Sequence, residues 1–237
     1  NNLPIITVID TNGTMNANAG PFEGQDRFQA REAVVNDLRN QGLLLKEESI
    51  AHAVGHCQRC HTIVEPLISK QWFIKIKPLA DPARKSILSG ETRIIPDHFS
   101  KVYDNWMANI RDWCISRQLW WGHRIPVWYC SDCNSETVSL DTVGSCKTCN
   151  SENVFQDPDV LDTWFSSGLW PHSTLGWPSE STDLNYFYPT SVMVTGYDIL
   201  FFWVARMMML GIENTGKPPF HTIYLHGLVK DADGIKM

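Results

Sequence analysis

The sequence predicts an α/β protein that carries a separate, cysteine-containing module. Three observations indicate this fold class. Near the C-terminus, two short apolar runs flank an apolar segment with helical spacing. Residues 125–157 form a stretch rich in Ser, Asp, Asn and Cys. Of the 237 residues, 43% are hydrophobic and 19% are charged, which excludes a disordered tail, a collagen-like chain and a coiled coil.

Charge and hydropathy restrict the partners and the compartment. The formal net charge of −6 gives no global attraction for nucleic acid, although a local basic patch stays compatible with it. No apolar run reaches the roughly 20 residues that span a bilayer, and the longest, residues 199–212, contains Arg206. The N-terminus is polar, without the basic region of a secretory signal. We therefore expect a cytoplasmic protein without membrane contact.

Local patterns predict four elements in the first half of the chain. Residues 4–9 and 72–76 have the composition or alternation of strands. A helix over about residues 27–41 is expected, because Asp26 is a suitable N-cap and Gly42 a suitable end. Residues 98–113 carry apolar side chains at helical spacing.

Four cysteines in the middle of the chain have the spacing of a structural zinc site. Two Cys-x-x-Cys pairs are separated by a 12-residue gap, and each pair places two thiolates on one tight turn. Four sulfur ligands close a tetrahedral site and leave no position for water. The alternative is four reduced surface thiols. The predicted ligands are Cys130, Cys133, Cys146 and Cys149.

A third pair, Cys57 and Cys60, is half of such a site. Its flanking residues His56 and His61 are possible substitute ligands, but we favour a partner pair upstream of residue 1. The seventh cysteine, Cys114, lies between Trp and Ile and is interpreted as a small core residue.

The C-terminal pattern predicts a parallel βαβ unit. Residues 191–195 and 222–225 are short apolar runs, and the segment between them has apolar residues at helical spacing from Ile199, with Gly211 as its expected end. In such a unit both strands end at one edge of the sheet, where ligands bind. Residues 159–165 are expected to add a third strand and to bring Trp164 to that edge.

Four residues directly after these strands should converge on one crevice. They are Gly196, Asp198, His226 and Gly227. Each has a structural alternative: a glycine makes a turn, and an aspartate caps the following helix. Periodicity alone places Trp203 in the core, and a lysine beyond the Asp-Ala-Asp-Gly turn either meets a polyphosphate or is solvated.

Several segments, in this order and spacing, resemble the class I aminoacyl-tRNA synthetases, and within that family its valine-specific members. The resemblance covers essentially the whole chain. Lys236 and Met237 are similar to the first two letters of the KMSKS signature, which binds ATP phosphates. The other segments are Gln71–Phe73, Trp113–His123 with Ile125–Pro126, Asp159–Pro171, Val194–Trp203 and Leu225–Val229.

The resemblance implies an enzyme that activates valine with ATP and Mg²⁺ and transfers it to the 3′ end of valine tRNA. The apolar walls of the valine pocket would come from Trp164, Ile199 and Trp203. Gly196 and Asp198 would meet the ATP ribose. Residues beside the adenine would be His226, Gly227 and Val229. Lys236 would act in catalysis and, with Met237, begin the phosphate loop.

The resemblance also implies a domain division and an origin as an internal fragment. Residues 1–55 resemble the tail of a β-rich editing insertion, and residues 56–97 a connecting ribbon with half a zinc site. Residues 98–237 would be the second half of a Rossmann-type nucleotide-binding domain, with a zinc ribbon at 128–153. Nothing matches the family's HIGH-type ATP motif, so the fragment alone should be inactive. The expected state of the parent enzyme is a monomer.

Two alternatives compete with this interpretation. One is a zinc-ribbon module that binds single-stranded nucleic acid by stacking on Trp120, Trp121 and Trp128, without catalysis. The other is a related class I enzyme specific for isoleucine or leucine.

Overall fold

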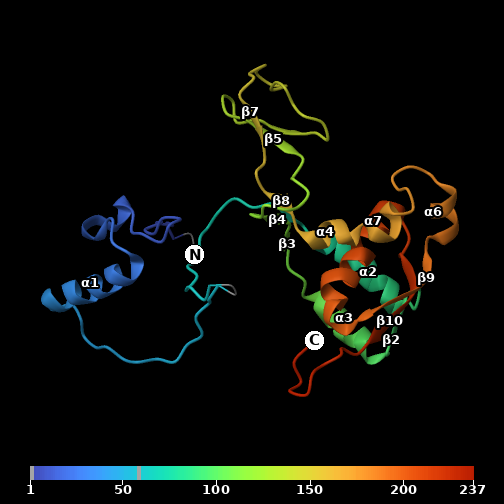
Figure 1. Ribbon diagram of the computed structural model, residues 1–237, viewed down its shortest axis with the longest axis horizontal. Coiled ribbons are helices and arrows are strands. Elements are labelled where there is room, and N and C mark those ends of the chain that lie inside the picture. The colour runs from blue at the N-terminus through green and yellow to red at the C-terminus, as the bar shows by residue number, and fades with distance from the viewer. Residues whose placement is uncertain (1–2, 58–59) are drawn as a thin grey trace. The chain divides into compact units, whose positions relative to one another are not determined.

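The computed structural model describes residues 3–57 and 60–237, which form two compact units, residues 1–70 and 71–237. Residues 1 and 2 of the predicted insertion tail lie outside the described residues. The compact units divide after residue 70, and a helix and a strand within 77–95 pack in the second unit (Figure 1). The predicted domain boundaries after residues 55 and 97 stay predictions.

The first unit contains a 3-10 helix, Ala17–Phe22, and α1 (Arg27–Asn40). The predicted helix is confirmed, and its N-cap is the expected one, because the Asp26 carboxylate accepts a hydrogen bond from the N–H of Phe28 at 2.9 Å. The strand predicted at 4–9 is wrong. Within it only Ile9 forms a β-bridge, with Met15, so the segment has no partner strand among the described residues. Ala30 is the one buried residue described in this unit.

The centre of the second unit is a three-stranded parallel sheet in the order β2-β10-β9. Its strands are β2 (Arg93–Ile95), β9 (Thr190–Gly196) and β10 (Phe220–His226). The parallel pairing of β9 with β10 confirms the predicted βαβ unit. The third strand is β2, which is too short to give a periodic signal in the sequence.

The third strand predicted at 159–165 is therefore wrong. Only β8 (Val160–Leu161) is extended, and it pairs antiparallel with β4 (Ser116–Arg117), outside the parallel sheet. Asp162 then caps α4 (Thr163–Gly168), which contains Trp164. A short apolar run does not distinguish a strand from a buried helix, and here the N-cap decides the outcome.

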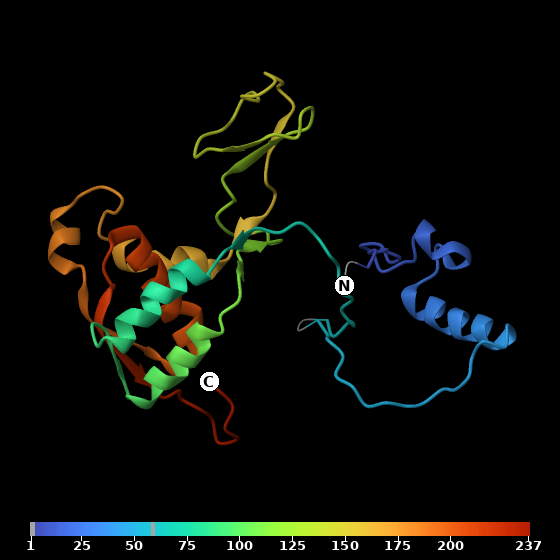
Figure 2. The same cartoon turned by 180° about the vertical axis from the view of Figure 1, so that it is seen from behind.

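Helices cover the parallel sheet and form the core with it (Figures 1 and 2). After β9 the chain forms one 3-10 turn (Tyr197–Ile199), one π-helical turn (Leu200–Val204) and α7 (Ala205–Thr215). Central residues of α7, Met207, Met208 and Met209, are at most 1% exposed. The other helices are α2 (Lys77–Leu88), α3 (His98–Ala108), α5 (Trp170–Ser173) and α6 (Thr182–Phe187).

Two helix ends differ from the prediction. The helix expected to reach residue 113 stops at Ala108, and Trp113 lies in β3 (Trp113–Cys114), paired with β1 (Phe73–Ile74). α7 continues past Gly211 and ends before Gly216, whose φ of 75° suits a glycine. Gly211 serves packing instead, because a Cβ there would lie 2.9 Å from the Tyr188 hydroxyl oxygen.

A small antiparallel sheet carries the four paired cysteines of the second unit. Its strands, β5 (Val127–Cys130), β6 (Glu136–Val138) and β7 (Val154–Gln156), have the order β6-β5-β7. Figure 2 shows this module projecting from the helices of the same unit.

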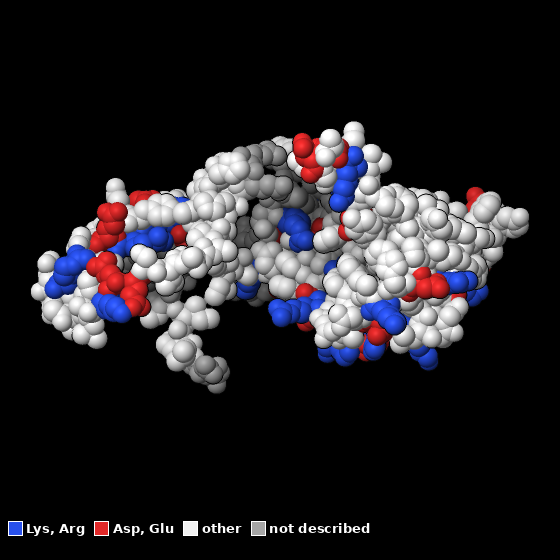
Figure 3. Space-filling view, turned by 90° about the horizontal axis from the view of Figure 1, so that it is seen from below, with Lys and Arg blue, Asp and Glu red and all other residues white. Residues whose placement is uncertain are grey.

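On the face shown in Figure 3, Lys and Arg side chains lie among Asp and Glu side chains. None of the helices in the described part of the chain has the length and apolar character to cross a bilayer.

Close packing of α4 on α7 depends on Gly168. A Cβ at this position would lie 2.8 Å from Leu210 Cδ1 and 3.3 Å from Arg206 Cβ. We expect Gly168→Ala to lower the free energy of unfolding by about 1–3 kcal/mol through overpacking. The measurement is urea unfolding followed by tryptophan fluorescence.

Gly144→Ala is the matched control, because nothing lies within 4 Å of a Cβ at that position. Equal stability of the two variants would contradict the packing argument.

Candidate functional site

The carboxyl edge of the parallel sheet brings together the residues predicted to converge there. Gly196 ends β9, His226 ends β10, and the two are register partners. Gly227 follows directly, and Asp198 lies in the 3-10 turn after β9. A Cβ on Gly196 would lie 2.7 Å from Asp198 Oδ1 and 3.0 Å from Leu228 Cδ2, so a larger residue here would displace these two side chains.

The C-terminal segment folds back to this edge. The predicted turn after Asp231 is formed, since the N–H of Gly234 donates to the Asp231 carbonyl at 3.1 Å and Gly234 has a φ of 79°. Beyond the turn, the Lys236 ammonium forms an ion pair with the Asp198 carboxylate. Its hydrogen bond is the main cause that lowers the pKa of Asp198 below its usual value. The N–H of Met237 donates to the Val229 carbonyl at 3.2 Å.

Beside the π-helical turn lies a mainly apolar cavity of about 340 Å³. Three indole rings and Ser167 line it, and both predicted tryptophans are among them. Trp203 donates its indole N–H to the Ser167 carbonyl at 3.1 Å. The lining residues are Trp164, Ser167, Trp170 and Trp203.

The third predicted wall residue, Ile199, does not line this cavity. Helical periodicity places Ile199 and Trp203 on one face, one α-helical turn apart. The structure instead places Ile199 in a 3-10 turn with a φ of −106° and a ψ of 16°. Trp203 lies in the π-helical turn, where the N–H of Ala205 donates to the Leu200 carbonyl, five residues back. Ile199 and Trp203 therefore do not share one regular α-helical turn.

Trp170 and the Ser167 carbonyl were not predicted as parts of a site. The sequence interpretation placed this region at the end of a strand, whereas it forms α4 and the start of α5. Trp164, Trp170 and Trp203 come together in the tertiary structure, and their spacing in the sequence does not predict this cluster.

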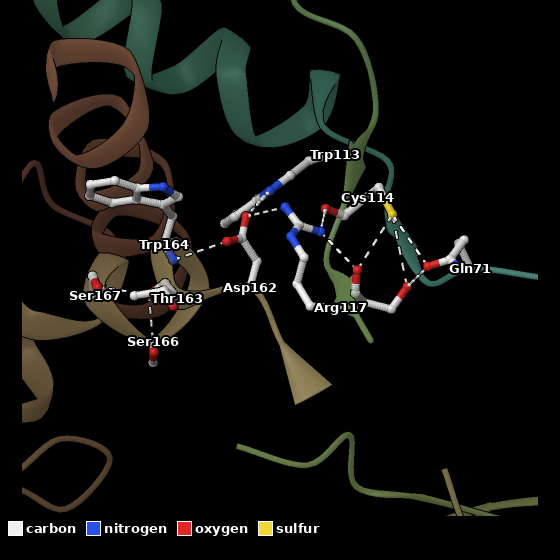
Figure 4. A network of polar contacts seen from close by, with 10 residues as sticks. Gln71, Trp113, Cys114, Arg117, Asp162, Thr163, Trp164, Ser166 and Ser167 are labelled. Carbon is white, nitrogen blue, oxygen red and sulfur yellow. Dashed lines mark hydrogen bonds and ion pairs between the residues drawn. The ribbon is translucent and has the colours of Figure 1, made fainter. Parts of the chain in front are cut away.

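A buried carboxylate at the start of α4 holds the surrounding elements together (Figure 4). Asp162 is 6% exposed. Its Oδ2 accepts hydrogen bonds from the Trp113 indole N–H at 2.9 Å and from Arg117 Nη2 at 2.8 Å. Its Oδ1 accepts from the backbone N–H of Trp164 at 3.4 Å. Asp162 is not among the predicted site residues.

Cations complement this carboxylate from two directions. Arg117 also donates from Nη1 to the carbonyl oxygens of Cys114 and Ser116, at 2.9 and 2.8 Å. Arg206 on α7 lies over the Trp113 ring, with its guanidinium carbon 4.0 Å from the ring centroid. Burial lowers the pKa of Arg206 to about 10, and the charge of Asp162 acts in the opposite direction.

The four cysteines of the projecting module form one cluster, as predicted. Their sulfur atoms all lie within 4.8 Å of one another. Cys130 and Cys149 are 3.6 Å apart, and Cys133 and Cys146 are 3.5 Å apart, with no disulfide between them. These separations are close to about 3.8 Å, the distance between sulfurs that bind one ion tetrahedrally at about 2.3 Å. The cluster is therefore suited to hold a metal ion.

Both cysteine pairs of the cluster lie on the same kind of turn. The N–H groups of Asn134 and Asn150 donate to the carbonyls of Cys130 and Cys146, each at 2.9 Å. Both asparagines have left-handed backbone, with φ of 56° and 59°. The Ser135 hydroxyl, followed by backbone N–H groups, lowers the pKa of Cys146 to about 5, which favours the thiolate that a metal requires.

Cys57 and Cys60 lie on a third turn of this kind. The N–H of His61 donates to the Cys57 carbonyl at 2.9 Å, and His61 has a φ of 58°. Within the described ranges 3–57 and 60–237, no third Cys, His, Asp or Glu joins the pair in a group suited to a metal. The Nδ1 atom of His56 contacts the His61 carbonyl at 2.7 Å.

A sequence comparison defines the class to which this fold and these sites belong. The family model described as "tRNA synthetases class I (I, L, M and V)" matches residues 28–237, so the chain belongs to the class I tRNA synthetases. The fold agrees: the chain resembles the methionyl-tRNA synthetase of Mycobacterium tuberculosis with a TM-score of 0.50. That alignment has 15% identity and covers 80% of this chain and 33% of the other.

Similar curated relatives are valine--tRNA ligases. The ligase of Carboxydothermus hydrogenoformans is 58% identical over 235 residues, and that of Dehalococcoides mccartyi is 59% identical over 235 residues. Each alignment covers 99% of this chain and 27% of the relative. The chain therefore spans about a quarter of the length of the curated relatives it matches. These matches do not favour the nucleic-acid module or the isoleucine or leucine enzyme.

The Asp162 network predicts a stability effect. We expect Asp162→Asn to lower the free energy of unfolding by about 1.5–3 kcal/mol, because a neutral amide replaces an acceptor of charged hydrogen bonds beside Arg117. Urea unfolding measures this change.

Asp159→Asn is the control for this prediction, since Asp159 accepts from the exposed Gln118 amide at 2.7 Å. Its effect should stay within about 0.5 kcal/mol. An Asp162→Asn variant as stable as this control would show that the network contributes little.

Proposed function

We propose that the chain is a segment of a valine--tRNA ligase, which activates valine with ATP and transfers it to the 3′ end of valine tRNA. The observation that carries this proposal is the 58% identity to a valine--tRNA ligase over 99% of the chain. The apolar cavity beside the π-helical turn that follows β9 supports it, because amino acid activation requires a side-chain pocket as well as a nucleotide site.

Trp164 and Trp203 are the proposed walls of the valine pocket. Both line the cavity, and indole rings offer an apolar surface to a branched side chain. Ile199 stays a proposed wall residue, and a structure of the enzyme with bound valine would show whether it contacts the side chain of valine. Such a pocket excludes larger side chains but rejects the isosteric threonine weakly. The tail of an editing insertion, proposed for residues 1–55, fits that requirement.

ATP is proposed to bind at the carboxyl edge of the sheet. Gly196 and Asp198 would meet the ribose. The adenine would lie beside His226, Gly227 and Val229.

In the activation step, a valine carboxylate oxygen attacks the α-phosphorus of ATP. The new P–O bond forms in line with the one that breaks, and pyrophosphate leaves with the electron pair. Lys236, with Met237, would begin the phosphate loop, and its ammonium would stabilise the negative charge that develops on the phosphate oxygens. Mg²⁺ enters with ATP as part of the substrate. Lys236 must leave Asp198 to act in this way.

Zinc is the proposed ion of the four-cysteine cluster. Thiolate ligands in a closed tetrahedral arrangement suit zinc, and such a site stabilises a fold without exposing the metal to substrate. Cys57 and Cys60 are proposed as half of a second site, completed by a cysteine pair of the parent enzyme. Valine tRNA is the proposed macromolecular partner, and a monomer the proposed state of the parent.

Valine-dependent exchange of pyrophosphate into ATP by the full-length parent tests the function. We expect saturable exchange with valine, weaker exchange with threonine, and little with isoleucine. Trp203→Ala should raise the KM for valine by about tenfold or more, because a large apolar wall is lost. Better activation of isoleucine than of valine would overturn the substrate assignment.

The metal content of the 237-residue chain tests the zinc proposal. We expect about one zinc per chain by atomic emission, and almost none in Cys146→Ser, because a closed site needs all four ligands. Cys114→Ser is the control, since Cys114 lies outside the cluster. Retention of zinc by Cys146→Ser would refute the site, and two zinc ions per chain would refute an external partner for Cys57 and Cys60.

A further inference from the structure

The orientation of Trp203 depends on contacts that lie outside its own helix. Trp203 belongs to the single π-helical turn between β9 and α7, and its indole N–H donates to the Ser167 carbonyl at 3.1 Å. One hydrogen bond fixes the nitrogen edge of the ring but not its tilt. Trp203 is also packed against the hydrophobic core, and a further contact on the cavity side would fix the tilt of the ring.

Trp170 supplies that contact. Its ring centroid lies 6.0 Å from that of Trp203, with an angle of 53° between the planes. This is within the range in which tilted aromatic pairs attract each other by about 0.5–1.5 kcal/mol beyond area burial. Both rings line the same cavity, and Trp170 is 48% exposed, so its packing against Trp203 is not a consequence of deep burial.

The two contacts come from consecutive segments with a common anchor. Ser167 is in α4, and Trp170 begins α5 after a single intervening cap residue, Leu169. α4 is fixed at its start by Asp162 and packs on α7 at Gly168. The carbonyl and the ring that hold Trp203 are therefore set at a defined separation by one short rigid stretch of chain.

We propose that Trp170 is a positioning residue for amino acid selection, which fixes the tilt of the Trp203 ring and so sets the width of the pocket. This inference rests on the proposed function, because it takes the cavity as the valine pocket. Without Trp170, the Trp203 ring keeps its hydrogen bond to Ser167 and its packing on the core but loses its ring contact, and the cavity wall becomes less rigid. Valine binds less tightly and larger apolar side chains enter. The nucleotide edge at Gly196 and His226 has no contact with Trp170 among the described ring and hydrogen-bond contacts.

Steady-state exchange kinetics of the full-length parent test this role. Trp170→Leu should raise the KM for valine about three- to tenfold, the equivalent of the lost ring contact. The KM for ATP should change less than about twofold, and the kcat/KM of isoleucine relative to valine should rise. Trp170→Phe keeps an aromatic ring and should restore most of the valine affinity. Trp170→Met serves in place of Trp170→Leu if the leucine variant does not fold.

Trp177→Leu is the matched control. Trp177 packs edge-on against His172 of α5, with ring centroids 5.0 Å apart, and does not line the cavity. Its replacement removes an equal indole near the same helix, and the KM for valine should stay unchanged.

Three results would overturn the inference. In the first, Trp170→Leu keeps the valine KM and the isoleucine discrimination of the natural enzyme. In the second, the KM values for valine and ATP rise together, which indicates a general loss of structure. In the third, Trp177→Leu has the same effect as Trp170→Leu. Failure of the proposed function is distinguishable, because the natural enzyme would then show no valine-dependent exchange at all.

Discussion

A single buried carboxylate, Asp162, fixes the start of α4 and with it the position of the apolar cavity. Its carboxylate accepts hydrogen bonds from the Trp113 indole of β3, from Arg117 of β4 and from the Trp164 N–H in the first turn of α4. A buried charge is tolerated only when it is paired and hydrogen-bonded. The elements that supply these partners are therefore held at fixed positions, and α4 carries Trp164 and the Ser167 carbonyl into the cavity wall from that point.

The parallel unit and the cysteine cluster were predictable, because each depends on local sequence. Apolar runs around a helical pattern indicated β9, β10 and the meeting of Gly196 with His226. Cys-x-x-Cys spacing indicated the cluster. What escaped prediction depends on contacts distant in sequence. β2 joins the sheet through β10, although more than 100 residues separate them. Asp162 binds Trp113 and Arg117 from 49 and 45 residues away, and the π-helical turn that contains Trp203 has no periodic signature in the sequence.

The three cysteine turns show how much of a metal site is local. In each, the first cysteine accepts a hydrogen bond from the residue four positions later, and that residue is His61, Asn134 or Asn150 in left-handed backbone. Two of these turns face each other in the projecting module and bring four sulfurs together. The third turn, at Cys57, has the same hydrogen bond and the same left-handed residue, without a facing pair in the described chain. The geometry of one half is thus encoded in about five residues, whereas the completeness of a site is a property of the tertiary fold.

In the ion pair between Lys236 and Asp198, each side chain takes the place of the nucleotide group that we propose for the other. Each member balances the charge of the other, although the Lys236 side chain stays 58% exposed. If a phosphate is taken up by Lys236 and the ribose by Asp198, as proposed, Lys236 exchanges one anionic partner for another, whereas Asp198 exchanges a cation for neutral hydroxyl groups. The loop then changes partners rather than acquiring its first ones.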